Sequence, residues 1–151
     1  MKYNMLSLLL CAGSLSAFAN PPAFNDYLIY DIHHGANHEL AEPNSGNEIL
    51  DKLRMMAIKK KPNFAGRYYL YTFGCGGGAI CGEVLDLKLG RVSTGLPDAY
   101  NGDGFDISFK VDSSLLIISG DGVNNHDSEH SGPSGNDLYY NFEGNKFKQI
   151  H

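Results

Sequence analysis

Residues 63–87 read NFAGRYYLYTFGCGGGAICGEVLDL and predict the centre of the fold. Both ends of this segment are rich in aromatic and branched residues, which are typical of β-strands. The middle contains Cys75, Cys81 and a run of glycines, which tolerate backbone dihedrals that other residues avoid. The segment therefore predicts two antiparallel strands, at residues 67–73 and 79–87, joined by a glycine-rich turn.

The first of these strands carries no charge after Arg67. Side chains alternate along a strand, so one face takes Tyr68, Leu70 and Thr72 and the other takes Tyr69, Tyr71 and Phe73. We therefore expect a strand that is covered on both faces, or one whose outer face is aromatic.

Two elements are expected before this segment. Aromatic and branched side chains over residues 27–32 predict a short strand, and the glycines and proline of residues 33–46 predict a loop. Apolar residues then recur at helical spacing, so residues 46–60 are predicted to form a helix whose apolar stripe packs into the core. Ser45, with Glu48 three residues later, fits a capping box at the start of this helix.

After the hairpin, the chain reads as further antiparallel sheet. Asp86 and Gly90 stand where a hairpin turn requires them, and residues 96–104 are expected to be loop. Further strands are expected at 105–111, 115–119, 138–142 and 146–150, with a long loop over 120–137. The sequence thus predicts an α+β domain, an antiparallel β meander or partly open barrel of about six to seven strands with one N-terminal helix packed on it.

Residues 1–19 are expected to lie outside this domain. Lys2 supplies a positive start, an apolar run follows, and small residues precede a cut after Ala19, a pattern typical of a secretory signal peptide. Cleavage there favours a periplasmic or secreted location. Residues 20–151 then form a single domain, in which no segment is long and apolar enough to span a membrane.

Two cysteines remain after the signal is removed, Cys75 and Cys81. In an oxidising compartment such a pair usually forms a disulfide, and closing so short a loop stabilises by about 2 kcal/mol. The bridge is therefore expected mainly to fix the shape of the turn. A metal site is the alternative, but two thiolates do not complete a zinc site. Lipidation of Cys11, within the signal, is disfavoured because the bulky Leu10 precedes it.

The charge balance excludes some classes of partner. The chain carries 12 Lys and Arg residues against 17 Asp and Glu residues, a net charge of −5, which becomes −6 once the signal with Lys2 is removed. Nucleic acids and anionic membrane surfaces need a basic face, so neither is an expected partner. A basic protein is compatible with this charge.

Several motifs resemble those of a largely uncharacterised group of small exported bacterial proteins. They are Asn-Phe-Ala-Gly-x-Tyr at 63–68, Gly-Cys-Gly at 74–76, Asp-x-x-x-Gly-x-Val at 86–92, and the segments 112–117 and 139–144. The resemblance covers about residues 63–150 and implies a periplasmic location and this order of hairpins. It supplies no catalytic residue. Several exported bacterial domains of this size are immunity proteins against secreted toxins, which is an analogy of class and not of sequence.

The polar loop that begins at Asp121 is the best candidate for chemistry. Its carboxylate and imidazole groups could ligate calcium or zinc: Asp121, His126, Asp127, Glu129 and His130. The spacing fits neither a helical His-Glu-x-x-His site nor an EF-hand loop, and two solvated turns are the competing interpretation. A metal-dependent hydrolase that uses this loop is therefore an alternative function.

The sequence assigns no catalytic residue, because no nucleophile stands in a recognisable setting. Residues that could instead contact a partner are Arg67, Tyr69, Tyr71, Tyr100, Asp103 and Tyr139. We therefore expect a periplasmic protein-binding module of the inhibitor or immunity type, without a cofactor. A small-ligand or cell-wall-binding domain that uses the tyrosines is a further alternative.

Overall fold

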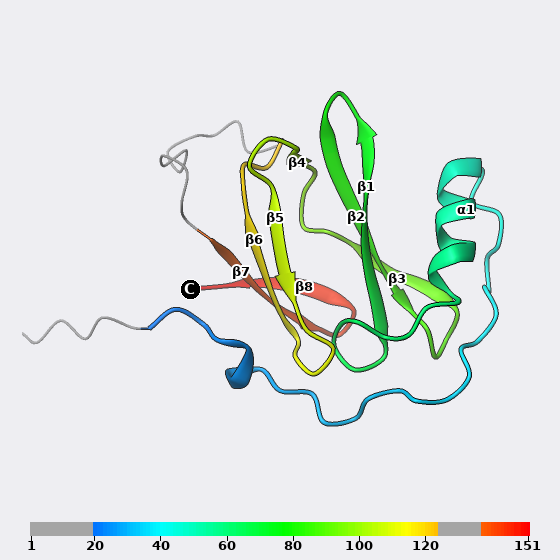
Figure 1. Cartoon of the computed structure of the whole chain (residues 1–151), viewed down its shortest axis with the longest axis horizontal. Coiled ribbons are helices and arrows are strands. Elements are labelled where there is room, and N and C mark those ends of the chain that lie inside the picture. The colour runs from blue at the N-terminus through cyan, green and yellow to red at the C-terminus, as the bar shows by residue number, and fades with distance from the viewer. Residues whose placement is uncertain (1–19, 124–136) are drawn as a thin grey trace, which may run out of the picture.

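The computed structural model describes residues 20–123 and 137–151 (Figure 1). The expected signal peptide lies outside these ranges. Within them, eight strands form two antiparallel sheets, which do not close into a barrel, and these accompany one α-helix and a short 3-10 helix, η1 (Phe24–Asp26). The expected α+β class is confirmed. No helix in the described part of the chain is long and apolar enough to cross a membrane.

The first sheet is built around the glycine-rich hairpin. Its strands are β1 (Tyr68–Gly76), β2 (Ala79–Asp86), β3 (Arg91–Gly95) and β4 (Tyr100–Asn101). β1 pairs with β2 from Tyr68 to Gly76, with one register shift between Gly74 and Gly76, so the predicted hairpin is confirmed. β3 and β4 both pair with the other side of β2, and β1 therefore forms an edge of this sheet.

The second sheet follows chain order. Its strands are β5 (Asp106–Phe109), β6 (Leu115–Ser119), β7 (Leu138–Glu143) and β8 (Lys146–Ile150). The β7–β8 turn has positive φ angles of 57° at Gly144 and 62° at Asn145, as a two-residue type I′ hairpin requires. These four strands lie where the alternating pattern predicts them, to within a few residues.

The main core lies between the two sheets. At its centre is Phe64, which precedes β1, is fully buried, and has its ring centroid 5.3 Å from that of Phe142 and 6.0 Å from that of Phe147. The other buried members come from both sheets: Tyr68, Leu70, Val84, Tyr100, Leu116, Ile118 and Tyr140. Burial of these side chains is the main force that holds the sheets together.

The outer face of the first sheet is covered by the helix α1 (Glu48–Ala57). Ala57 is buried with Leu85 and Leu87, and the half-buried rings of Tyr69 and Tyr71 pack against this second cluster. The first half of β1 is therefore covered on both faces, which is one of the two arrangements expected from its uncharged alternation, whereas Thr72 and residues 74–76 are exposed.

Helix α1 differs from its prediction in three ways. It spans residues 48–57 and is therefore shorter than the predicted 46–60. Its N-cap is Asn47, whose side chain accepts hydrogen bonds from the N–H groups of Ile49 and Leu50. The predicted capping box is wrong, because the Ser45 hydroxyl donates instead to Asp51. The apolar stripe also reaches the core only in part. A short helix on one sheet buries only the side turned toward it, and Ile49 remains 71% exposed and Met56 56% exposed.

Two strand predictions need correction. Residues 27–32 do not form a strand: they make one bridge, Leu28 to Ser113, and hydrogen bonds to loops such as Ile29 N–H to the carbonyl of Asp112. β3 and β4 lie where turn and loop were expected. They are short and have little alternation, so pairing with β2 decides their conformation.

Residues 29–41, the N-terminal segment, run along the lower side of the molecule in Figure 1. Their N–H groups donate to three loop carbonyls: His33 to Gly66, His38 to Leu87, and Ala41 to Gly90. Gly66 and Gly90 have positive φ angles of 82° and 67°. A Cβ atom on Gly66 would lie 2.5 Å from the carbonyl oxygen of Asp31, and one on Gly90 would collide with that of Glu39. Glycine at both positions thus allows the segment to pack closely.

Candidate functional site

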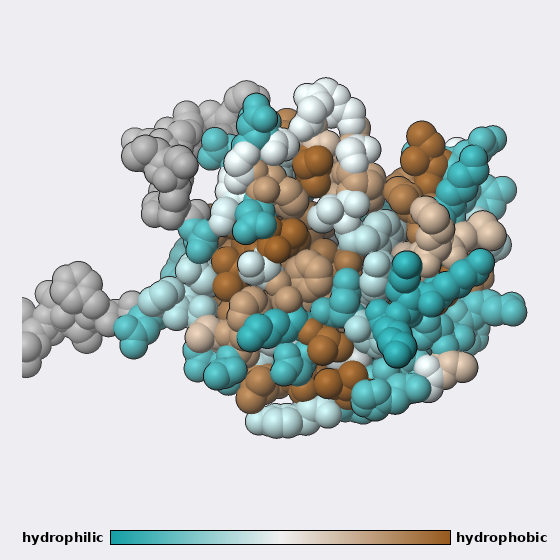
Figure 2. Space-filling view, viewed as in Figure 1, coloured by the Kyte–Doolittle hydropathy of each residue, from teal (hydrophilic) through white to brown (hydrophobic). Residues whose placement is uncertain are grey.

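The turn of the β1–β2 hairpin projects beyond the rest of the first sheet (Figure 1). In Figure 2 it is a pale projection, neither strongly polar nor strongly apolar. Gly76, Gly77 and Gly78 have φ angles of 108°, 60° and 81°, and the space beside each is open. These positions therefore require glycine because of their positive φ angles, and not because a side chain would lack space. We call residues 72–82 the hairpin end.

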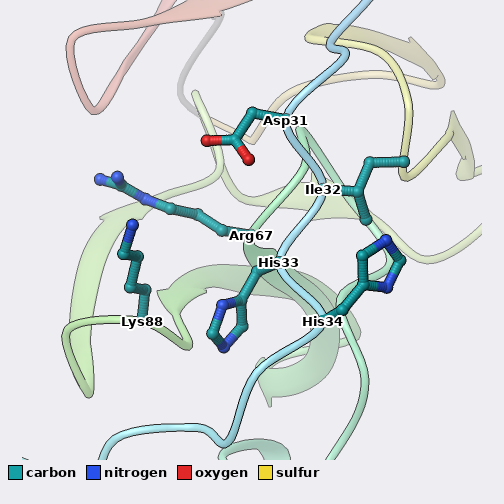
Figure 3. A pocket seen from close by; sticks show the side chains of 6 residues that line it. All are labelled: Asp31, Ile32, His33, His34, Arg67 and Lys88. Carbon is teal, nitrogen blue, oxygen red and sulfur yellow. The ribbon is translucent and has the colours of Figure 1, made fainter.

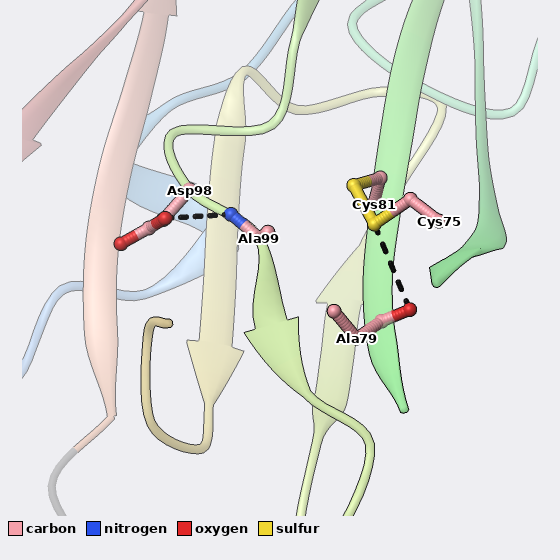
Figure 4. The surroundings of a disulfide bond; sticks show 5 residues. All are labelled: Cys75, Ala79, Cys81, Asp98 and Ala99. Carbon is pink, nitrogen blue, oxygen red and sulfur yellow. Dashed lines mark hydrogen bonds between the residues drawn. A yellow bond between two sulfur atoms is a disulfide. The ribbon is translucent and has the colours of Figure 1, made fainter. Parts of the chain in front are cut away.

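A disulfide joins Cys75 to Cys81 across the hairpin end, as predicted (Figure 4). The two Cα atoms are 5.7 Å apart, and Cys75 Sγ lies 3.6 Å from the carbonyl oxygen of Ala79. Register shifts between Gly74 and Gly76, so the bridge spans the point where regular pairing is lost. The disulfide therefore stabilises a glycine-rich turn in which few side chains are available to make other contacts.

The edge of β1 is blocked in its first half and open in its second. The Asn63 amide accepts from Leu70 N–H at 2.7 Å and donates to the Leu70 carbonyl at 2.9 Å, as a neighbouring strand would. Because backbone groups alternate in direction, those of Thr72 and Gly74 also point away from β2. Both residues are exposed, and these outward groups make no hydrogen bond within the described residues.

A buried ionic cluster joins α1 to the first sheet. Arg54 donates from Nη2 to Glu83 Oε1 at 2.6 Å and from Nε to Oε2 at 3.0 Å, and the Tyr71 hydroxyl donates to Oε2 at 2.6 Å. Burial alone would raise the pKa of Glu83, but the hydrogen bonds from Arg54 and Tyr71 outweigh it and lower that pKa. Burial and the Glu83 contact raise the pKa of Tyr71. Arg54, Glu83 and Tyr71 thus provide hydrogen-bond partners for one another, and we interpret the cluster as one that stabilises the fold.

Six residues line a polar pocket of about 210 Å³ beside the N-terminal segment (Figure 3): Asp31, Ile32, His33, His34, Arg67 and Lys88. We call it the Arg67 pocket. Arg67 Nη2 lies 2.9 Å from Asp86 Oδ2, and its guanidinium carbon lies 5.1 Å from the ring centroid of Tyr68. Asp86 is only 1% exposed and also accepts from Lys88 N–H and Leu89 N–H. The Arg67 guanidinium in this pocket is therefore held in place by an ion pair with a buried carboxylate.

Of the predicted metal ligands, only Asp121 lies in the described part of the chain, where it is exposed. His126, Asp127, Glu129 and His130 lie outside it. Over residues 20–123 and 137–151, no three His, Cys, Asp or Glu side chains are grouped to hold a metal ion. A calcium or zinc site in the polar loop, and the hydrolase that would use it, remain predictions.

The six predicted contact residues do not form one surface. Tyr69 and Tyr71 lie partly under α1, Arg67 is in the pocket, and Tyr139 is on β7 in the other sheet. Asp103 is exposed after β4. The prediction that Tyr100 contacts a partner is wrong, because its side chain is only 1% exposed and lies in the main core. Burial also raises the pKa of its hydroxyl group.

The open edge of β1 and the pairing of Glu83 with Arg54 were not predicted from the sequence. The sequence nevertheless contains one indication of each feature. No charge and no proline occurs from residue 68 to 82, whereas natural edge strands usually carry one or the other. Glu83 is a single carboxylate in an otherwise apolar strand, which requires a partner.

Comparisons of this chain with protein-family models, with curated proteins and with solved structures gave no match. The resemblance to small exported bacterial proteins therefore stays a prediction.

Proposed function

We propose that the protein is an exported recognition module, of the inhibitor or immunity type, that binds another protein by pairing with the open edge of β1. In this mode, an extended segment of the partner adds a strand to the first sheet, and main-chain hydrogen bonds provide the affinity. The observation that carries the proposal is the pair of outward, unpaired backbone positions at Thr72 and Gly74, both exposed.

The surroundings of this edge support strand addition. Exposed edges are normally protected by charge, proline or cover, because any strand can pair with them. Here, Asn63 covers the edge only at Leu70, and the uncharged segment from 68 to 82 leaves the rest open. The disulfide holds the hairpin end in shape before binding, which reduces the entropy cost of association.

The charges near the hairpin end favour a basic partner segment. Gly102 N–H donates to the carbonyl of Gly78 at 3.0 Å and Asn101 N–H to that of Asp121 at 2.9 Å, so the turn after β4 lies against the hairpin. Exposed Asp103 and Asp121 are thereby held close to its tip. Lysine or arginine in a partner would be attracted to them.

The test compares two substitutions of one residue. Partners are captured on immobilised residues 20–151 from the cell-envelope fraction, and the purified partner is then titrated with Thr72→Pro and Thr72→Val. Proline removes the outward N–H group, whereas valine keeps it and nearly keeps the side-chain shape. We expect Thr72→Pro to lose at least tenfold in affinity and Thr72→Val to bind as the wild type does. Equal binding by both variants, or loss in both, contradicts strand addition. Circular dichroism of each variant confirms that the fold is retained.

A further inference from the structure

We propose that the Arg67 pocket binds the oxyanion of a small ligand, a carboxylate or a phosphate group, at a site separate from the hairpin end. Figure 3 shows the end of Lys88 just below the end of Arg67, with the ring of His33 beside Lys88. A guanidinium, an ammonium and an imidazole group around one cavity form a set of donors suited to such an anion.

Two nitrogen atoms of this pocket's residues are unsatisfied. Arg67 Nε and His33 Nε2 are buried and have no hydrogen-bond partner. Arg67 Nε always carries a proton, so it can only donate. Buried polar atoms nearly always have partners, and exceptions need an explanation such as a bound water or ion. Asp86 Oδ2 is also buried without a hydrogen-bond partner and lies 2.9 Å from Arg67 Nη2, so this carboxylate competes with a ligand for the guanidinium. A ligand oxygen in the pocket would have to be shared by Arg67, Lys88 and His33.

The pocket walls are held in place before any ligand arrives. His33 N–H donates to the Gly66 carbonyl at 2.9 Å, which fixes the N-terminal segment beside Arg67. Gly66 has no space for a Cβ atom beneath Asp31. Asp86 Oδ2 holds the Arg67 guanidinium through Nη2, at 2.9 Å. A site held in this way loses little conformational entropy on binding.

The size and the remaining charge of the pocket restrict the ligand. A volume of about 210 Å³ is below the range of drug-sized ligand sites, so the pocket takes a small molecule or one terminal group of a larger one. Asp31 lines the same cavity and would repel a bare multivalent anion. It favours a ligand that carries a hydroxyl or ammonium donor beside the oxyanion.

The experiment titrates residues 20–151 with sodium acetate, glycine or sodium phosphate at constant ionic strength and follows the Arg67 Nε–Hε resonance by NMR. The variants are Lys88→Ala, which removes an exposed ammonium group of the pocket, and Lys148→Ala, a control on β8. We expect a saturable shift of the Arg67 resonance with at least one probe, an affinity at least fivefold weaker in Lys88→Ala, and no change in Lys148→Ala.

The probes separate the sources of the oxyanion. A preference for acetate and glycine identifies a carboxylate ligand, and a preference for phosphate identifies a phosphorylated one. The proposal is overturned if no probe gives a saturable shift, or if both lysine variants weaken binding equally, as a nonspecific charge effect would. Thr72→Pro should bind the probes normally, so failure here is distinguishable from failure of strand addition.

Discussion

Arg54 on α1 and Glu83 on β2 form a two-point ion pair, with nitrogen–oxygen distances of 2.6 and 3.0 Å. The two side chains are 15% and 12% exposed, so little water competes for the contact. Because α1 has several apolar residues in solvent and only Ala57 fully buried, this pair is a main attachment of the helix to the first sheet.

Breaking the pair on one side should be costly. Arg54→Met leaves the Glu83 carboxylate buried with only Tyr71 as a partner, and we expect a loss of about 2–4 kcal/mol in the free energy of unfolding. The double variant Arg54→Met/Glu83→Gln removes both charges and should be less destabilised than Arg54→Met alone. Urea denaturation measures both values. A single variant no less stable than the double variant would show that the pair does not hold the helix.

The pH dependence of stability should report the same pair. The pKa of Glu83 is lowered from its ordinary value of 4.5 in the folded state, so the unfolded chain binds its proton first as pH falls. The stabilisation is therefore complete above about pH 5 and is lost as pH falls through 4.5 toward the lower folded pKa. Between pH 6 and 3, Glu83→Gln should lose less stability than the wild type. Glu143→Gln, which alters an exposed glutamate, should follow the wild-type profile.

The close packing of the N-terminal segment can be tested with matched glycines. Gly66 and Gly104 have φ angles of 82° and 81°, but only Gly66 lacks space for a Cβ atom. Gly104→Ala should cost about 1–2 kcal/mol, the strain of a left-handed alanine. Gly66→Ala adds a clash with the Asp31 carbonyl and should cost at least about 1 kcal/mol more. Thermal or urea unfolding measures the difference in stability. Equal losses of stability in the two variants would mean that the N-terminal segment moves aside for the Cβ atom at no cost in free energy.

Removing the disulfide should have a modest effect. Cys75 and Cys81 are six residues apart, and the loop-entropy relation gives about 2 kcal/mol for so short a loop. We expect Cys75→Ser/Cys81→Ser to unfold at lower urea concentration by that amount and to keep both sheets by circular dichroism. Loss of the whole fold would show that the bridge does more than shape the hairpin end.

The sequence predicts the hairpin well, because glycines, cysteines and alternation are local signals. It predicts the sites less well, because these depend on which distant groups meet. The lone Glu83 signals a need for a cation, but nothing local selects Arg54 from the 12 Lys and Arg residues of the chain. Tyr100 sits in a segment without alternation, so its burial could not be inferred. The blocking of Leu70 by Asn63 arises from the turn between them, which becomes visible only in three dimensions.

Amide hydrogen exchange along β1 tests strand recognition most directly. In the free protein, the N–H groups of Tyr71 and Phe73 face β2 and should exchange slowly, whereas those of Thr72 and Gly74 should exchange quickly. Addition of the captured partner should slow exchange at Thr72 and Gly74. Equal protection of all four amides in the free protein, or no slowing at Thr72 and Gly74 in the complex, would contradict the account.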